Sequence, residues 1–311
     1  MGESVAILIP TRNRPNHLAK LLRSITLSTI KPIQVVVVAS GQNVESVIGD
    51  FRESLQITYC HTESKGQIAQ KRIGVELLTE EIEWCLFLDD DLILGESAII
   101  SAFSGVSAYR KTDIIGIGLS VAPSSRSLGL SNWKLKLLKL FKLSSNSPGQ
   151  VLPSGHATSY LQETTLIETQ WLNGASMWRV EHAKDYGKGL PSTPYAACED
   201  LIFSYPLSKK GKLIYVPYAR VDFQDTERTQ FDSFEVFKAA TLWRYYFITQ
   251  HRELSFYWFI LGQVVRSLYA IGGAKNKSVN LFHDLLKLNV KIVSSYISNV
   301  SPLILLSQLN D

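Results

Sequence analysis

Three consecutive carboxylates, Asp89, Asp90 and Asp91, follow the apolar run at residues 84–88. Adjacent like charges repel, so a binding partner is needed to offset the repulsion. At the end of a strand, alternate side chains share one side, which would let Asp89 and Asp91 bind one divalent cation while Asp90 points elsewhere. Mg²⁺ or Mn²⁺ bound in this way keeps open positions for phosphate oxygens. The alternative interpretation is an acidic turn that caps the next element.

A second acidic pair, Glu199 and Asp200, stands directly before an apolar helical pattern. Acidic residues at a helix start are stabilised by the helix dipole, so capping is one interpretation. The functional interpretation is a general base held in a pocket, where a carboxylate removes the proton from an attacking hydroxyl.

Two further segments carry groups that suit a nucleotide or a phosphate. The first follows the opening apolar run and offers hydroxyl, amide and guanidinium groups from Pro10, Thr11, Asn13 and Arg14. In the second, Gly66 precedes a helical pattern that contains Lys71 and Arg72. A helix N-terminus and basic side chains both favour phosphate. The alternatives are an ordinary strand-to-helix turn and basic side chains in solvent.

The elements around these residues alternate between strand and helix. Apolar runs at 5–9, 35–38 and 84–88 predict buried strands, and amphipathic patterns at 17–26 and 68–78 predict helices between them. The order strand, helix, strand, helix, strand indicates an α/β domain with a largely parallel sheet. Ligands bind at the carboxyl ends of such strands, where the loops with Pro10, Ser40 and Asp89 begin.

The C-terminal part has a different composition. Helices are expected from about residue 231 to 271 and from 281 to 306, which gives an α/β domain at 1–230 and a helical extension at 231–311. The run at 256–271 is shorter than the roughly 20 apolar residues that span a bilayer. The basic, amphipathic segment 133–143 carries Trp133 and suits a membrane interface. The alternative is packing against the α/β domain or a second subunit.

Composition excludes some classes of protein. The 311 residues carry a net charge of +4, from 32 basic and 28 acidic residues, which is too balanced to indicate nucleic-acid binding. The cysteines Cys60, Cys85 and Cys198 lack C-x-x-C spacing, so neither a disulfide framework nor a thiolate zinc site is expected. No basic region followed by a long apolar segment stands at the N-terminus. We therefore expect a cytoplasmic protein that can associate with the inner face of the membrane.

In their order and spacing, these motifs resemble the family 2 glycosyltransferases, which are inverting nucleotide-sugar enzymes. The resemblance covers about residues 4–230. The matching pieces are I-L-I-P-T-R-N-R, V-V-V-V-A-S-G, K-G-Q-I-A-Q-K-R-I-G, L-F-L-D-D-D, W-L-N-G-A-S-M-W-R and C-E-D-L-I-F-S-Y-P-L-S-K-K-G. The resemblance implies a GT-A fold, an α/β architecture with a mixed, mostly parallel sheet flanked by helices. The C-terminal helices would extend that fold.

The resemblance also implies roles for particular residues. Asp200 would be the catalytic base and Glu199 would position it or the acceptor. Asp91, with Asp89, would bind a divalent metal, Mn²⁺ or Mg²⁺. The nucleotide-sugar site would comprise Pro10, Thr11, Asn13, Arg14, Ser40, Lys71, Arg72, Asp89 and Asp90, and the acceptor side Trp171, Asn173 and Gly174. The donor would be a UDP- or dTDP-sugar, and the acceptor a saccharide or lipid-linked saccharide, as in polysaccharide biosynthesis.

Three features depart from the family pattern. Relatives often have an Asp after the second strand, whereas this chain has Ala39-Ser40-Gly41. Relatives commonly read Arg-Asn where this chain has Lys71-Arg72. Many members also carry a His after a P-x-A-x-V stretch, and here Asp222 or Gln224 is the candidate for that place.

Two other functions share some of these sequence features. A nucleotidyltransferase also uses paired carboxylates and a metal, but it predicts a glycine-rich loop after the first strand, and residues 10–14 contain no glycine. A catalytically silent nucleotide-sugar-binding relative would not need Asp91 and Asp200, and both are present. The sequence therefore favours an active glycosyltransferase.

Overall fold

The computed structural model describes residues 3–110, 113–121, 132–191, 193, 196–224, 233–273 and 279–309. The chain forms two compact units. Unit 1 comprises residues 1–126, 159–192 and 199–228, and unit 2 comprises residues 127–158, 193–198 and 229–311. The chain therefore enters unit 2 three times. The predicted boundary at residue 230 falls outside the described residues.

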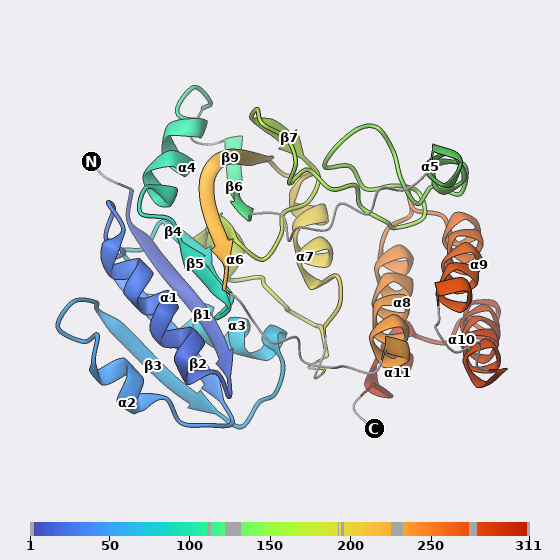
Figure 1. Cartoon of the computed structure of the whole chain (residues 1–311), viewed down its shortest axis with the longest axis horizontal. Helices are drawn as coiled ribbons and strands as arrows, with labels where there is room; N and C mark the ends of the chain where they lie inside the picture. The colour runs from blue at the N-terminus through green and yellow to red at the C-terminus, as the bar shows by residue number, and fades with distance from the viewer. Residues whose placement is uncertain are drawn as a thin grey trace. The chain divides into compact units, whose positions relative to one another are not determined.

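Unit 1 is built on a mixed β-sheet (Figure 1). The strand order is β3-β2-β1-β4-β8-β6-β9-β5, and β7 pairs with β9 beside this path. Neighbours within β3-β2-β1-β4 are parallel, as are β6 and β9, whereas the other pairs are antiparallel. The strands are β1 (Val5–Arg12), β2 (Gln34–Ser40), β3 (Ile57–Thr62), β4 (Trp84–Phe87), β5 (Leu92–Leu94), β6 (Ile114–Val121), β7 (Ile167–Thr169), β8 (Ser176–Arg179) and β9 (Lys212–Phe223).

Helices cover both faces of this sheet, because its strands alternate their side chains between two cores. Val5, Ile7 and Ile9 of β1 enter one core, and Ala6 and Leu8 enter the other. The first core receives side chains from α1 (Pro15–Leu27), α2 (Glu45–Gly49) and α4 (Ala98–Val106). The second receives side chains from α3 (Gln67–Glu76), α6 (Val180–Ala183) and α7 (Glu199–Leu207).

The register of the parallel strands places the candidate site residues at one edge. Leu8 of β1 lies opposite both Val36 of β2 and Phe87 of β4. β1 and β2 end opposite each other at Arg12 and Ser40, and β4 runs parallel to them, so the segments that follow the three strands leave the sheet at the same edge. The acidic triplet and the polar residues after β1 and β2 meet there.

The predicted element order omits two elements. The helix α2 and the strand β3 stand between β2 and α3 in the structure. All residues of β3 are partly or fully exposed, and its sequence I-T-Y-C-H-T lacks the continuous apolar character of a buried parallel strand. α2 has only five residues, too few to show a helical period.

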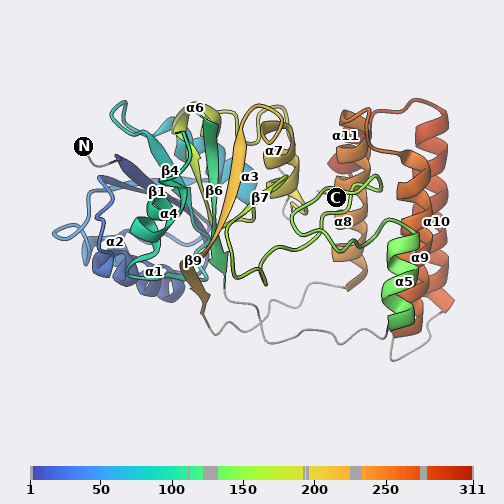
Figure 2. The ribbon, with the colours of Figure 1, turned by 90° about the horizontal axis from the view of Figure 1, so that it is seen from above.

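The described part of unit 2 is helical, which confirms the helices expected near the C-terminus. These are α5 (Asn132–Leu140), α8 (Ser233–Gln250), α9 (Phe256–Gly273), α10 (Val279–Ile297) and α11 (Pro302–Ser307). α8, α9 and α10 lie side by side (Figure 2). Within the described ranges, none of the helices combines the length and hydropathy needed to cross a bilayer.

Candidate active site

Asp90 and Asp91, which follow β4, are held by Thr11 at the end of β1 and by Arg14 just after that strand. The hydroxyl of Thr11 donates a 2.7 Å hydrogen bond to Asp90 Oδ2. Arg14 Nη1 lies 3.0 Å from Asp90 Oδ1 and 3.4 Å from Asp91 Oδ2. Burial raises the pKa of Asp90, and the contacts with Thr11 and Arg14 oppose that rise. One guanidinium thus contacts two adjacent carboxylates and reduces their repulsion.

Asp89 faces a different element, the first turns of α3. This helix begins after Gly66, whose φ of 99° is in the region that favours glycine. Gln67 Nε2 donates a hydrogen bond to Asp89 Oδ1, and Lys71 Nζ lies 3.5 Å from the same oxygen. Gln67 and Lys71 are four residues apart, so both project from one face of α3. The three carboxylates of the triplet therefore have two separate sets of partners.

Lys71 is a fully buried cation between two acidic motifs. Its Nζ lies 3.5 Å from Asp89 Oδ1 and 4.0 Å from Asp200 Oδ1. It also lies over the rings of Phe87 and Tyr186, at 5.7 and 5.4 Å from their centroids. Burial lowers the pKa of Lys71, but the neighbouring carboxylates outweigh burial and raise it. Lys71 therefore stays charged and links the triplet to the second acidic pair.

That pair, Glu199 and Asp200, forms the first turn of α7. Burial raises the pKa of both carboxyls, and the negative charge of Asp200 raises that of Glu199 further. Lys71 opposes the rise at both residues. Each of the two carboxyls therefore holds a proton more readily than a free carboxyl does, and Lys71 limits that effect. An ionised Asp200 can accept a proton.

Glycine at position 174 leaves space between the two acidic motifs. A Cβ at this position would lie 3.1 Å from Asp89 Oδ2 and 3.5 Å from Asp200 Oδ2. The side chains of Asp89 and Asp200 are 36% and 28% exposed, whereas Lys71 is 0% exposed, so a ligand can reach the carboxylates but not the ammonium. A cavity of about 320 Å³ is lined by Asp89, Asn173 and Gly174 among others.

The two other residues expected on the acceptor side lie near this cavity. The backbone N–H of Asn173 donates a 2.7 Å hydrogen bond to the Tyr160 hydroxyl. The buried Oδ1 of Asn173 has no hydrogen-bond partner in the described part of the chain. The ring of Trp171 packs on that of Tyr160, with centroids 5.0 Å apart.

The remaining predicted nucleotide-site residues are spread along the same sheet edge. Pro10 lies within β1, opposite Val38. Asn13 adopts a φ of 56° and its Oδ1 accepts a 2.8 Å hydrogen bond from the Gln42 N–H, which joins the loops after β1 and β2. Ser40 ends β2 with a buried hydroxyl. Arg72 makes no ion pair with the carboxylates that the structure describes, unlike its neighbour Lys71.

Comparison with known proteins identifies the family. The sequence model of Glycosyl transferase family 2 matches residues 6–162, about half of the chain. The chain belongs to this family. It is accordingly a glycosyltransferase, as the sequence predicted. No curated protein matches the sequence.

Solved structures of other glycosyltransferases share the fold. The structure of S. aureus TarS 1-349 in complex with UDP-GlcNAc has a TM-score of 0.61 at 13% identity, covering 99% of this chain and 90% of that chain. The mannosyltransferase PcManGT from Pyrobaculum calidifontis, in complex with GDP-Man and Mn²⁺, has a TM-score of 0.54 at 13% identity, covering 100% and 87%. The predicted GT-A fold is confirmed.

Gln70 supports the candidate site and was not among the residues that the sequence patterns indicated. Its Nε2 donates to Thr11 O at 2.7 Å and to Val38 O at 2.9 Å, which fastens the ends of β1 and β2 together. Gln67, Gln70 and Lys71 stand at spacings of three and four residues, which places them on one face of α3. The polar residues at this spacing on one face of α3 were the available signal.

Gln224, a candidate for the place of the family His, supports the backbone of the triplet. Its Nε2 donates to the carbonyl oxygens of His17, Asp90 and Leu92 at 3.0–3.1 Å. Its own N–H donates to Asp91 O at 2.8 Å. The other candidate, Asp222, pairs with Ile93 where β9 meets β5. Gln224 thus fixes the chain that carries Asp90 and Asp91.

Replacing Gln224 with alanine is expected to destabilise the glycosyltransferase. The substitution leaves the buried carbonyls that Nε2 contacts without a donor, which costs about 1–3 kcal/mol of unfolding free energy. Urea denaturation measures this change. The control is Gln56→Ala, because Gln56 is exposed. Equal stabilities of the two variants would contradict the bracing role of the Gln224 amide.

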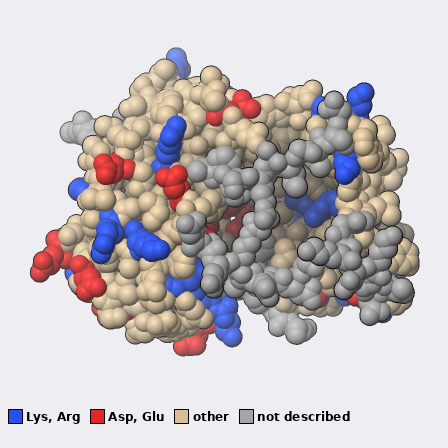
Figure 3. All heavy atoms as spheres, in the orientation of Figure 1, with Lys and Arg blue, Asp and Glu red and all other residues tan. Residues whose placement is uncertain are grey.

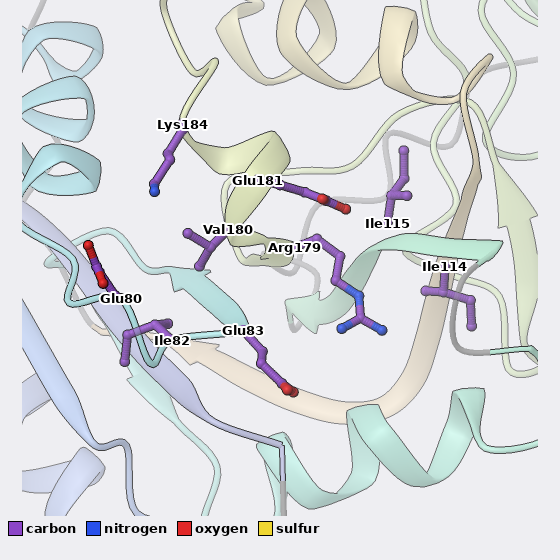
Figure 4. Close-up of a pocket in the computed structure, with 9 residues that line it drawn as sticks. All are labelled: Glu80, Ile82, Glu83, Ile114, Ile115, Arg179, Val180, Glu181 and Lys184. Atoms are coloured by element: carbon purple, nitrogen blue, oxygen red, sulfur yellow. The ribbon is translucent and has the colours of Figure 1, made fainter.

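A second cavity of about 670 Å³ lies at the opposite end of β4 (Figure 4). Its lining includes Glu83, which precedes β4, and Arg179, which ends β8. The acidic triplet follows the other end of β4. This cavity is therefore separate from the carboxylates of the candidate active site.

Proposed function

We propose that the enzyme transfers a sugar from a nucleoside-diphosphate sugar to a hydroxyl of a saccharide or lipid-linked saccharide, with inversion at the anomeric carbon. The main support is the position of Asp89 and Asp200 on either side of the space left by Gly174, with Lys71 between them. That arrangement brings a donor-side carboxylate and a candidate base close to the same glycine, beside the cavity that Asp89 and Gly174 line.

On the donor side, we assign the nucleotide to the sheet edge at the carboxyl ends of β1, β2 and β4. Thr11 and Arg14 already contact Asp90, so the nucleotide meets a preorganised polar surface. Pro10, Asn13 and Ser40 border this surface. UDP- or dTDP-sugars are the expected donors. The nucleotide sugars in the TarS and PcManGT structures support this class of donor, at the level of the shared fold.

For the chemical step, we assign Asp200 as general base. It removes the proton of the acceptor hydroxyl while that oxygen bonds to the anomeric carbon and the bond to the nucleoside diphosphate breaks. Burial and Asp200 raise the pKa of Glu199, and in its protonated form Glu199 can donate a hydrogen bond that positions the base or the acceptor. Trp171 and Asn173 hold the acceptor in line with the leaving group, which removes orientational freedom from the reaction.

We also propose a divalent cation, Mn²⁺ or Mg²⁺, held by Asp91 with Asp89. Among the residues that the structure describes, no three His, Cys, Asp or Glu side chains gather as a metal site. The carboxylates therefore suit a cation that the donor phosphates help to bind, which is common for Mg²⁺. The buried Oε1 of Gln224 has no hydrogen-bond partner in this part of the chain and is a further oxygen donor. When bound, such a cation offsets negative charge on the leaving diphosphate.

A panel of nucleotide sugars tests the proposed donor. We expect one or two UDP- or dTDP-sugars to raise the melting temperature with Mn²⁺ present, and EDTA to weaken the effect, because ligands stabilise the state they bind. Released nucleoside diphosphate, measured with the stabilising sugar, reports turnover. Pyrophosphate release from a nucleoside triphosphate and a sugar phosphate would instead identify a nucleotidyltransferase. Binding without any turnover would identify a silent relative.

We further propose that unit 2 contacts a membrane surface, where lipid-linked acceptors reside. Apolar side chains are exposed in a stripe on α10, at Phe282, Leu286, Val290 and Ile297. Their spacing of four, four and seven residues places them on one helix face. Trp133 of the basic helix α5 is 62% exposed. Exposed apolar and basic helices suit an anionic lipid surface.

Flotation with anionic liposomes tests this proposal. The wild-type enzyme is expected to float with the vesicles, and a variant with Phe282, Leu286 and Val290 replaced by serine to remain at the bottom. Neutral vesicles should bind less enzyme, because part of the attraction is electrostatic. Failure of the wild type to float would favour the alternative, in which this stripe packs against a second subunit.

A further inference from the structure

Unit 2 contains a basic cluster that the proposed transfer chemistry does not use. It consists of Arg244 on α8, Arg266 on α9 and His156 in the loop that follows α5. α8 and α9 pack against each other (Figure 1). Basic side chains reach the surface over α8 in the space-filling view (Figure 3). Both arginines are partly exposed, so the cluster is accessible from solvent.

Two unusual backbone positions hold Arg244. Its Nε donates to Gly155 O at 3.2 Å, and its Nη2 donates to Cys198 Sγ at 3.2 Å. Gly155 has a φ of +75°, and a Cβ there would lie 2.5 Å from Ile248 Cγ2, so only glycine lets this loop approach α8. Cys198 has a φ of 65°, which is uncommon for a residue with a side chain and points to a constrained position.

Arg266 is held by neutral groups. Its Nη1 donates to Gln263 Oε1 at 3.1 Å, and Gln263 is fixed in turn by donating to the Thr241 hydroxyl at 2.9 Å. The guanidinium lies over the ring of Phe237, 4.9 Å from its centroid. A guanidinium has five N–H donors, and these contacts use only one of them.

The two guanidinium groups lack a counter-charge. Within the described ranges, neither Arg244 nor Arg266 forms an ion pair with a carboxylate. Burial and the positive charge of Arg244 together lower the pKa of Arg266 to about 10. Like charges held together in a partly buried site are costly unless an anion compensates them. Such an arrangement is typical of an anion-binding site.

His156 supplies a third group that is free to bind. Its Nδ1 lies 3.2 Å from Ser154 Oγ, and the Ser154 hydroxyl donates its own proton to Lys142 O. The Ser154 oxygen must therefore accept from Nδ1, which leaves Nε2 of the neutral ring as an acceptor. Nε2 is buried and has no hydrogen-bond partner in the part of the chain that is described. It can share a proton with an acidic oxygen.

We propose that Arg244, Arg266 and His156 form a binding site for a phosphate group, supplied by a phosphate ester or by free phosphate. Two guanidinium forks match the several oxygens of a phosphate, and charge-assisted hydrogen bonds are the strong ones. The remaining phosphate oxygen shares its proton with His156 Nε2. A carboxylate has only two oxygens and would leave part of this donor set unused. The site does not depend on the proposed sugar transfer.

Phosphate binding by the full chain tests this site. Wild-type protein and the Arg252→Gln control, which removes an exposed arginine of the same unit, should gain melting temperature with inorganic phosphate relative to chloride at equal ionic strength. Arg244→Gln and Arg266→Gln should raise the dissociation constant for phosphate at least about tenfold. An equal response of all four proteins would overturn the proposal, because the phosphate would then bind elsewhere.

Measurements on the wild type keep the test valid if a variant does not fold. The ³¹P resonance of phosphate should broaden on addition of wild-type protein, and an unchanged line together with an unchanged melting temperature would overturn the site. Glycerol 3-phosphate and a glycerol phosphodiester are tested beside inorganic phosphate. The compound that binds tightest shows whether the site takes a phosphate monoester, a phosphodiester or free phosphate. No nucleotide sugar or acceptor is needed, so absence of transferase activity would count against the proposed function and not against this site.

Discussion

Asp200→Asn enzyme is expected to transfer sugar about 10³-fold more slowly than the wild type, because an amide cannot accept the acceptor proton and general-base catalysis contributes about 10²–10⁴-fold. Asparagine has the size of aspartate, so the space next to Gly174 is preserved. Donor binding should therefore be nearly unchanged. Initial rates of transfer, together with donor titration by melting temperature, separate the chemical step from binding.

Asp185→Asn is the matched control, since Asp185 is an exposed carboxylate of unit 1. Its transfer rate should stay within about twofold of the wild type, as expected for a surface change. An Asp200→Asn protein that keeps more than a tenth of the wild-type rate would contradict the assignment of Asp200 as base. Loss of donor binding in the same variant would indicate instead that Asp200 belongs to the donor site.

Lys71→Met is expected to lower the transfer rate about 10²-fold near neutral pH, with a smaller loss at higher pH. Lys71 opposes the rise in the pKa of Asp200 that burial and Asp89 cause. Without the cation, the pKa of Asp200 rises further and less of the base is ionised at a given pH. The acidic limb of the rate profile should move up by about one to three pH units, the usual effect of a nearby opposite charge.

The pH profile of kcat/KM distinguishes this electrostatic role from a packing role. A purely structural Lys71 would give a loss that is the same at every pH, which would falsify the proposed coupling. The charged groups that interact with Asp200, and so shape this pH profile, are Lys71, Asp89 and Glu199. Lys65→Met is the control, because Lys65 is exposed in the segment that precedes α3 and should leave both the rate and the profile unchanged.

The sequence predicted the parallel part of the sheet because buried parallel strands are continuous apolar runs. β1, β2 and β4 have this character, with every residue of β2 buried. The predicted alternation of Asp89, Asp90 and Asp91, with Asp90 pointing away from the other two, was a less reliable inference. β4 ends at Phe87, so the alternation of a strand does not reach Asp89, and Asp90 and Asp91 share Arg14 as a partner.

The contacts that complete the site depend on tertiary structure and could not be predicted from local patterns. Gln224 bonds to the backbone of Asp90, 134 residues earlier in the chain, and nothing in the sequence near either residue indicates this. The sequence predicts Lys71 as a nucleotide-sugar contact, with a cation in solvent as the alternative, and neither interpretation includes burial because lysine is seldom buried. Its burial follows from the carboxylates of Asp89 and Asp200, which the fold brings to it from two other elements.

The chain contributes three separate segments to unit 2, which restricts how this unit can be removed or exchanged. The loop at Pro153 accepts a hydrogen bond from the Ser255 N–H, and Lys142 lies over the ring of Trp258. These contacts join the segment 127–158 to the segment 229–311 within one unit. A gene truncated after residue 230 would encode loops whose packing partners are missing. Exchange of unit 2 between relatives therefore requires three separate stretches of the gene to change together.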